Sequence, residues 1–285
     1  PVGLGAKRTR TCVMVHPCYV VCRGPVSIAR RIVRGKAPID FDKTEPATQT
    51  YMAEFIQSAT VLSATDLTPD VRQLVLLPRE QPLGFKPGQW VSLKLPVGTR
   101  PPLNRAYSMA SPSTSSGELT LIFDRVTGGL GSSYLFQMKP GDELILSGPH
   151  GNFVLPPSID REIVFVARYT GLVPIRCMLK ELFARPFRGS IFLIGVAPAE
   201  EELLFHQELL SLAITHPIFR YLPLVAAAGE QQAVDLTLPM LEPLFDGGEK
   251  VLPLLCGTKA FVRPLRSRFV SAGYDRKEVK TETYD

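Results

Sequence analysis

The chain has 285 residues, of which 45% are hydrophobic and 21% charged, and its formal net charge at pH 7 is +5. It is long enough for two globular domains with sizeable cores, and no uninterrupted apolar run approaches the roughly 20 residues of a membrane span. Its five cysteines are an odd number, which argues against a disulfide framework and for a reducing compartment. We therefore expect a protein with no membrane span and no secreted disulfide scaffold.

The positive charge is concentrated at the N-terminus. Residues 1–36 contain eight Lys or Arg and no Asp or Glu, and subtracting these eight from +5 leaves −3 for the rest of the chain. Such a segment can be an organellar transit sequence, a surface that attracts phosphates, or upstream sequence without functional consequence. We expect residues 1–51 to be a basic extension outside the functional module. The expected location is the cytoplasm, or an organelle matrix if the extension is a transit segment.

No nucleic-acid site or metal site is expected. Aromatic side chains that could stack on bases do not interleave with the basic residues of the extension. Cys12, Cys18 and Cys22 have the spacing C-x5-C-x3-C, which differs from the C-x4-C-x2-C of a plant-type 2Fe–2S site, and the next cysteine, Cys177, is far away. The four histidines show no metal-ligand spacing either.

Residues 52–155 are predicted to form a small antiparallel β-barrel. Residues 71–77 are rich in Val and Leu, and apolar residues alternate with polar ones over 91–95 and with smaller or mixed ones over 119–123. A further short strand is expected around 144–146, and Pro–Gly and Thr–Pro–Asp clusters separate these segments. Short strands at this spacing, with one helix after Gly131, are typical of a barrel. Pro156 and Pro157 then form a stiff linker.

Residues 158–285 are predicted to form a doubly wound, Rossmann-like α/β domain. The run 163–167 is continuously apolar, as in a strand of a parallel sheet that is buried on both faces, and further strands are expected at 190–196, 221–225 and 251–257. Helices are expected over 175–183, 200–212 and 261–272, with a terminal strand at 279–284. This alternation is typical of a nucleotide-binding domain. The dinucleotide fingerprint G-x-G-x-x-G is absent.

Two short motifs in the first half suggest a cofactor site. Residues 105–108 (RAYS) offer a guanidinium, an aromatic ring and a hydroxyl, and residues 128–135 (GGLGSSYL) are a glycine run that leads into an apolar segment. A helix that begins in this run would present free N–H groups to an anion. Together the motifs offer groups that could bind a diphosphate and a flat heterocycle. The residues expected to bind are Arg105, Ala106, Tyr107, Ser108, Gly129, Gly131, Ser132 and Ser133.

This pair of motifs resembles the FAD site of the ferredoxin–NADP reductase superfamily, and the stretches 87–91 and 148–153 fall where that family has equivalents. The resemblance extends from Met52 to the C-terminus. It implies FAD as cofactor and NADH or NADPH as co-substrate. It also implies that Arg105 pairs with the FAD diphosphate, that Tyr107 packs on the ring system or ribityl chain, and that Ser108 hydrogen-bonds near N5.

The same resemblance assigns residues near the C-terminus to the nicotinamide site. Relatives place a cysteine such as Cys256, followed by Gly257, beside the nicotinamide C4; the alternative is an ordinary buried core cysteine. Glu282 and Tyr284 resemble the closing acidic and aromatic residues of the family. The expected catalytic residues are therefore Ser108, Cys256 and Glu282.

The phosphate turn of the second domain departs from the family pattern. Relatives have G-G-T-G-x-x-P, and this chain keeps Thr170, Gly171 and Pro174 but has Arg168 and Tyr169 in place of two glycines. Arg168 could supply charge, Tyr169 could plug the site, or the turn could keep its shape without its ligand. Ala197 stands where relatives often place an arginine for the adenosine ribose or its 2′-phosphate, which favours NADH over NADPH.

The resulting hypothesis is a FAD-dependent oxidoreductase. It would take hydride from NAD(P)H and pass electrons to a small-molecule acceptor or to an iron–sulfur, haem or oxygenase-component protein. The alternative is a non-catalytic FAD-binding subunit or scaffold with a degenerate nicotinamide site, which the altered turn would explain.

Overall fold

The computed structural model describes residues 14–16, 19–20, 55–98, 101–185, 187, 189–245 and 250–284. The chain divides into two compact units, Pro1–Thr50 and Tyr51–Asp285. In the first unit, strands β1 (Met14–His16) and β2 (Tyr19–Val20) pair antiparallel. The expectations for Cys12, Cys18 and Cys22 lie outside the described residues.

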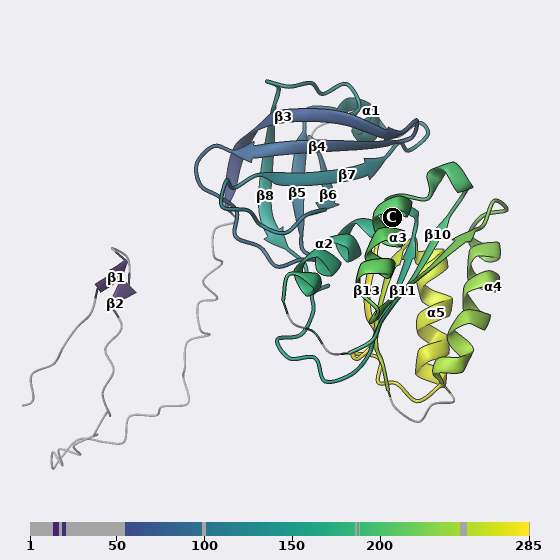
Figure 1. Cartoon of the computed structure of the whole chain (residues 1–285). Helices are drawn as coiled ribbons and strands as arrows, with labels where there is room; N and C mark the ends of the chain where they lie inside the picture. The colour runs from purple at the N-terminus through teal and green to yellow at the C-terminus, as the bar shows by residue number, and fades with distance from the viewer. Residues whose placement is uncertain are drawn as a thin grey trace, which may run out of the picture. The chain divides into compact units, whose positions relative to one another are not determined.

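The second unit begins with six antiparallel strands in the order β6-β5-β8-β3-β4-β7 (Figure 1). An isolated bridge between Met109 and Leu121, and a bond from the Ala110 N–H to the Thr120 carbonyl at 2.8 Å, join the two edges of this sheet into a barrel. The strands are β3 (Ile56–Thr68), β4 (Val71–Pro78), β5 (Trp90–Leu95), β6 (Leu103–Ser108), β7 (Leu119–Asp124) and β8 (Glu143–His150).

Sequence alternation places one face of each strand in the barrel core. Val91, Leu93 and Leu95 of β5 are fully buried, as expected for side chains that point to the same face at every second position. The short helix α1 (Leu130–Leu135) follows β7 and buries Leu135 against the same core. The expected barrel is confirmed.

The second half of this unit is a parallel sheet in the order β11-β10-β9-β12-β13, with helices on both faces (Figure 1). Ile163 and Phe165 of β9 pack with α2, whereas Val164 and Val166 pack with α4 and α5, so β9 is buried on both sides. The expected doubly wound domain is confirmed. Its elements are β9 (Ile163–Arg168), α2 (Leu172–Phe183), β10 (Ile191–Ala197), α3 (His206–Thr215), β11 (Phe219–Val225), α4 (Glu230–Leu241), β12 (Leu252–Gly257), α5 (Lys259–Ser271) and β13 (Lys280–Thr283).

One helix expectation needs correction, and one further helix is missed by the sequence pattern. The helix expected over 200–212 is interrupted: a 3-10 turn covers Glu200–Glu202, and α3 begins only at His206, because Phe205 has a left-handed backbone with φ of 58°. Helix α4 was not predicted at all. Its buried residues Ala233, Val234 and Leu241 have helical spacing, but Pro239 inside the segment disguises the pattern.

The order of the parallel strands fixes where a ligand can bind. Strand β9 pairs with β10 on one side and β12 on the other, so the chain reverses its direction of winding between β9 and β12. Ligands of open α/β sheets bind outside the carboxyl ends of the strands at such a point. Here those ends carry the turn after Arg168 and the pair Cys256–Gly257. None of the described helices is long and apolar enough to cross a membrane.

Candidate functional site

Arg105 of β6 and Gly131 of α1 are in contact. A Cβ atom on Gly131 would lie 3.4 Å from Cγ of Arg105 and 3.2 Å from side-chain carbons of Leu95 and Leu103, so the glycine lets the arginine stem lie against the helix start. The Arg105 side chain is exposed and donates to the Asn104 carbonyl at 2.9 Å. The Arg105 stem is thereby held beside the start of α1, and its guanidinium is exposed, so that it can pair with a diphosphate.

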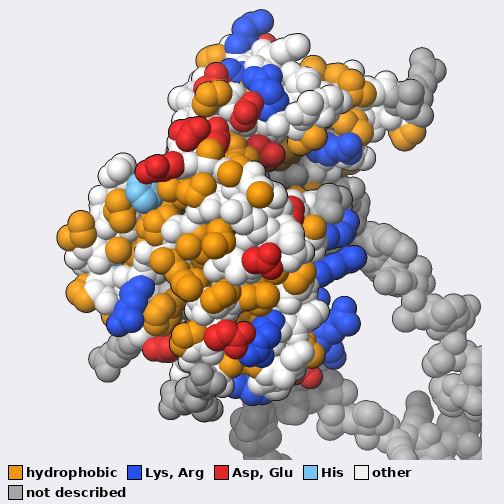
Figure 2. Space-filling view, turned by 90° about the vertical axis from the view of Figure 1, so that its right-hand side faces the viewer, with side chains coloured by type: hydrophobic (Ala, Val, Ile, Leu, Met, Phe, Trp, Pro, Cys, Tyr) orange, Lys and Arg blue, Asp and Glu red, His pale blue; other side chains and the backbone are white. Residues whose placement is uncertain are grey.

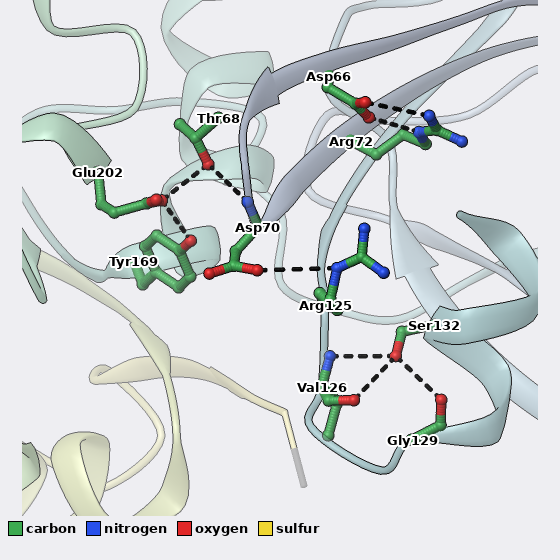
Figure 3. A network of polar contacts seen from close by, with 10 residues as sticks. All are labelled: Asp66, Thr68, Asp70, Arg72, Arg125, Val126, Gly129, Ser132, Tyr169 and Glu202. Atoms are coloured by element: carbon green, nitrogen blue, oxygen red, sulfur yellow. Dashed lines mark hydrogen bonds and ion pairs between the residues drawn. The ribbon is translucent and has the colours of Figure 1, made fainter. Parts of the chain in front are cut away.

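The loop before α1 is held by Ser132. Its hydroxyl accepts the Val126 N–H at 3.0 Å and lies 3.2 Å from the Gly129 carbonyl (Figure 3). The Ser133 N–H already donates to Gly129 at 3.0 Å, which leaves Ser133 its exposed hydroxyl rather than its N–H for a ligand. The N–H groups of Gly131 and Ser132 belong to the first turn and have no intrahelical partner. These groups fit the diphosphate of FAD.

The remaining residues of the 105–108 motif lie as their strand positions require. Tyr107 is half-buried, with its ring centroid 5.3 Å from that of Phe123, and burial raises its pKa to about 12. Its phenol is therefore protonated at neutral pH. Ala106 is exposed, and Ser108 at the end of β6 is buried.

Ser108, Tyr284 and Cys256 form one polar cluster. The Cys256 thiol donates to the Tyr284 phenol oxygen at 3.2 Å, and the Ser108 hydroxyl is close enough to this phenol to oppose the rise that burial causes in the pKa of Tyr284. The Tyr284 N–H donates to the Gly257 carbonyl at 3.1 Å. Tyr284 thus lies between the end of β6 in the barrel and the end of β12 in the α/β domain. Three residues predicted separately from the sequence are brought together here.

Burial determines the protonation of this cluster. Cys256 is fully buried, and burial holds the pKa of its thiol well above the usual range, so it is no thiolate nucleophile. Glu282 lies opposite Cys256 in the β12–β13 register, and burial raises its pKa to about 6. The site therefore holds a carboxyl that titrates near neutral pH beside a permanently neutral thiol.

Replacing Glu282 with glutamine is expected to remove a pH dependence of stability. Because the folded-state pKa is raised, the unfolded chain loses the Glu282 proton first as pH rises from 4.5 to about 6, and the folded state becomes relatively less stable in that interval. The difference in Tm between Glu282→Gln and the natural chain should increase from pH 4.5 to 6 and then level off. A Tm difference that is constant from pH 4.5 to 7 would contradict the raised pKa.

The charge of Arg168 is engaged within the α/β domain. The side chain is buried, its Nε donates to Glu230 Oε1 at 3.0 Å, and its Nη1 donates to the Val196 carbonyl at 3.2 Å. The other Glu230 oxygen accepts the Thr258 hydroxyl at 2.7 Å. Arg168 therefore ties the starts of α4 and α5 to the sheet. The idea that its charge compensates for the missing glycines is not supported.

The part of the turn that matches the family pattern is built tightly against its surroundings. The Thr170 hydroxyl donates to Asp124 Oδ1 at 2.9 Å, which links the turn to the end of β7. A Cβ on Gly171 would lie 2.5 Å from the Cys256 carbonyl oxygen, so only glycine allows this approach to β12. Pro174 is buried in the first turn of α2.

Three residues of this region were not predicted from the sequence. Asp124 partners Thr170, and Glu202 accepts hydrogen bonds from Tyr169 and Thr68. These contacts join positions 33 to 134 residues apart, and no local motif marks them. Within the described residues, no three His, Cys, Asp or Glu side chains are grouped so as to hold a metal ion.

Comparisons with known proteins identify this combination of barrel and α/β domain. Residues 58–155 match the family model of the oxidoreductase FAD-binding domain. Ferredoxin–NADP reductase B of Sorangium cellulosum is 31% identical over 237 residues, which cover 80% of this chain and 97% of that protein. The phenol hydroxylase P5 protein of Acinetobacter pittii is 29% identical over 79% of this chain, but the chain spans only 65% of its length. The crystal structure of an Amycolatopsis cytochrome P450 reductase is 26% identical with a TM-score of 0.69, covering 81% of this chain and 70% of that one.

The fold and site define a FAD-dependent, NAD(P)H-dependent flavoprotein oxidoreductase. The chain belongs to the ferredoxin–NADP reductase superfamily, as its sequence motifs implied.

Proposed function

We propose that this chain takes hydride from NADH in preference to NADPH and delivers electrons to a partner protein with an iron–sulfur, haem or oxygenase centre. The cluster of Ser108, Tyr284 and Cys256 carries the proposal, because it joins the flavin motif to the carboxyl end of β12. Bound FAD supplies the chemistry that accepts a hydride and gives electrons onward.

The barrel residues bind and orient the flavin. The Arg105 guanidinium pairs with the diphosphate, and the Gly131 and Ser132 N–H groups donate to it, with Gly129 shaping the loop and Ser133 offering its hydroxyl. Tyr107 packs on the ring system or ribityl chain. Ala106 belongs to the same strand and binds through its backbone.

The α/β residues position the nicotinamide ring. Thr170, Gly171 and Pro174 shape the turn at the start of α2, and Cys256 with Gly257 forms a small, neutral surface at the end of β12. Ser108 hydrogen-bonds near the flavin N5, and Glu282 and Tyr284 close the site. These groups exclude water and hold the reduced nicotinamide at the flavin. The protein thus contributes to catalysis by positioning the reactants.

The preference for NADH rests on charge. Ala197 at the end of β10 provides no cation, and the exposed carboxylates Glu200 and Glu201 follow it. On the face of the molecule that Figure 2 draws, acidic side chains gather between its upper and lower parts. A 2′-phosphate near these carboxylates would be repelled, whereas a ribose hydroxyl can donate to them.

The proposed acceptor follows from the relatives. Two further relatives are named as the reductase component of a terephthalate 1,2-dioxygenase and the electron transfer component of a toluate 1,2-dioxygenase, and the relative from Sorangium cellulosum is named as a ferredoxin–NADP reductase. A partner oxygenase or ferredoxin is therefore the acceptor that we propose for this chain.

Anaerobic stopped-flow measurement of flavin absorbance tests the function. NADH should bleach the flavin faster than NADPH at equal concentration. The double variant Glu200→Gln/Glu201→Gln should raise kcat/KM for NADPH several-fold, at about 0.2–1 kcal/mol per exposed charge, and leave NADH nearly unchanged. An absence of bleaching at millimolar concentrations of either nucleotide would instead support the non-catalytic FAD-binding subunit.

A further inference from the structure

Tyr169 has an unusual backbone conformation. Its φ is 50°, in the left-handed region that disfavours residues other than glycine, and it occupies the place of a glycine in the related turns. Surrounding contacts must hold a residue in such a conformation.

Hydrogen bonds fix the Tyr169 side chain at its far end. The phenol donates to Glu202 Oε2 at 2.5 Å, and the Thr68 hydroxyl from the end of β3 donates to the same oxygen at 2.9 Å (Figure 3). The Thr68 hydroxyl also accepts the Asp70 N–H at 3.3 Å. Burial and the Glu202 carboxylate raise the pKa of Tyr169, so the phenol keeps its proton and remains a donor.

The ring of Tyr169 lies over the carboxyl ends of β9 and β10. It lines a pocket together with the small residues Ala167, Gly195 and Ala197 and the side chains of Glu202 and Tyr221. The cavity volume left there is about 10 Å³, about the minimum that a single water molecule requires. Small residues form one wall of this pocket, and the rings of Tyr169 and Tyr221 line it as well; Tyr221 Cε2 would lie 3.3 Å from a Cβ atom on Gly195.

A dinucleotide would need this space. Its nicotinamide end belongs at Cys256 and Tyr284 if the proposed function is right. The turn that contains Gly171 already lies against the backbone of β12, because a Cβ atom on Gly171 would lie 2.5 Å from the Cys256 carbonyl oxygen. The rest of the dinucleotide must therefore run over the ends of β9 and β10, along the crevice that parallel α/β sheets use.

We propose that Tyr169 occupies the crevice of the adenosine half, so that this chain recognises its hydride donor mainly through the nicotinamide ribotide. The substrate class is then reduced nicotinamide ribotides, with the adenosine half left at the surface near Glu200 and Glu201. The donor gives one hydride, which is two electrons and one proton, from nicotinamide C4 to FAD and leaves as the oxidised ribotide. This proposal rests on the proposed function for the nicotinamide end.

Reduced nicotinamide mononucleotide, which lacks the adenosine half, is the probe. Stopped-flow flavin reduction with this compound and with NADH is measured for the natural FAD-loaded chain, Tyr169→Gly and Tyr169→Phe. The natural chain should favour NADH in kcat/KM by less than about tenfold, and Tyr169→Gly should raise that preference by a further tenfold or more, since each factor of ten reflects about 1.4 kcal/mol of added grip. Tyr169→Phe, which keeps the ring, should resemble the natural chain.

Binding of ADP-ribose by calorimetry separates this proposal from the proposed function. The natural chain should show no binding at millimolar ADP-ribose, and Tyr169→Gly should bind it; FAD content shows that the variant is folded. If ADP-ribose behaves this way but no donor bleaches the flavin, the function fails and the occupied crevice stands. Equal ADP-ribose binding by both proteins, or a hundredfold NADH preference in the natural chain, overturns the proposal.

Discussion

Arg105→Ala is expected to yield a folded protein that loses its FAD on dialysis. The Arg105 stem lies against Gly131 at the start of α1, and its guanidinium is exposed, so its removal opens no core cavity. A charge-assisted hydrogen bond contributes about 1.5–3 kcal/mol, which corresponds to about 10- to 150-fold weaker FAD binding. Flavin absorbance before and after dialysis measures the loss.

Arg79→Ala is the matched control for this prediction. Arg79 follows β4 on the same barrel and is half-exposed, and it forms an ion pair with Glu143 at 2.6 Å. It has the same charge as Arg105 but lies outside the flavin motif. This variant should retain FAD fully. Equal flavin retention by Arg105→Ala and Arg79→Ala would mean that the 105–108 motif is not the diphosphate site.

The strands were predictable because their signals are local. In β5 and β7 the apolar side chains alternate, and the wholly apolar run of β9 matches its burial on both faces. The helix errors have local causes too. Phe205 enters the left-handed region and delays α3, and Pro239 hides the period of α4. A phenylalanine does not normally mark a left-handed residue, and a proline normally marks the end of a helix. Composition and period alone could therefore reveal neither feature.

The site was predictable only where its residues are adjacent in the sequence. Arg105, Tyr107 and Ser108 lie on one strand, and the glycine run before α1 is contiguous, so their types and spacing indicate a diphosphate and a ring. The contacts of Tyr169 with Glu202 and of Thr170 with Asp124 depend on how barrel and α/β domain meet. Packing between distant segments determines such pairs, and a motif in one segment carries no information about them.

Gly171→Ala is expected to destabilise the protein and slow flavin reduction while FAD remains bound. A Cβ atom at this position would lie 2.5 Å from the Cys256 carbonyl oxygen and 2.7 Å from its carbon, and these backbone atoms cannot rotate away. Such overpacking costs about 1–3 kcal/mol. The turn must move from β12, which displaces Thr170 relative to Cys256, and a shift of about 1 Å in a reacting geometry can cost about a hundredfold in rate.

Urea unfolding and stopped-flow reduction by NADH measure the two effects, and Gly84→Ala controls for the added methyl group. Gly84 has no heavy atom within 4 Å of the position that its Cβ would take, so its variant should match the natural chain in both assays. FAD content should be unchanged in both variants, because the flavin groups belong to the barrel. If Gly171→Ala kept both its stability and its rate, the close approach of the turn to β12 would not be needed for nicotinamide binding. A purely structural defect lowers the fraction of folded molecules and leaves their rate constant for flavin reduction unchanged. A lower rate constant in Gly171→Ala molecules that are still folded would therefore place the turn in hydride transfer itself.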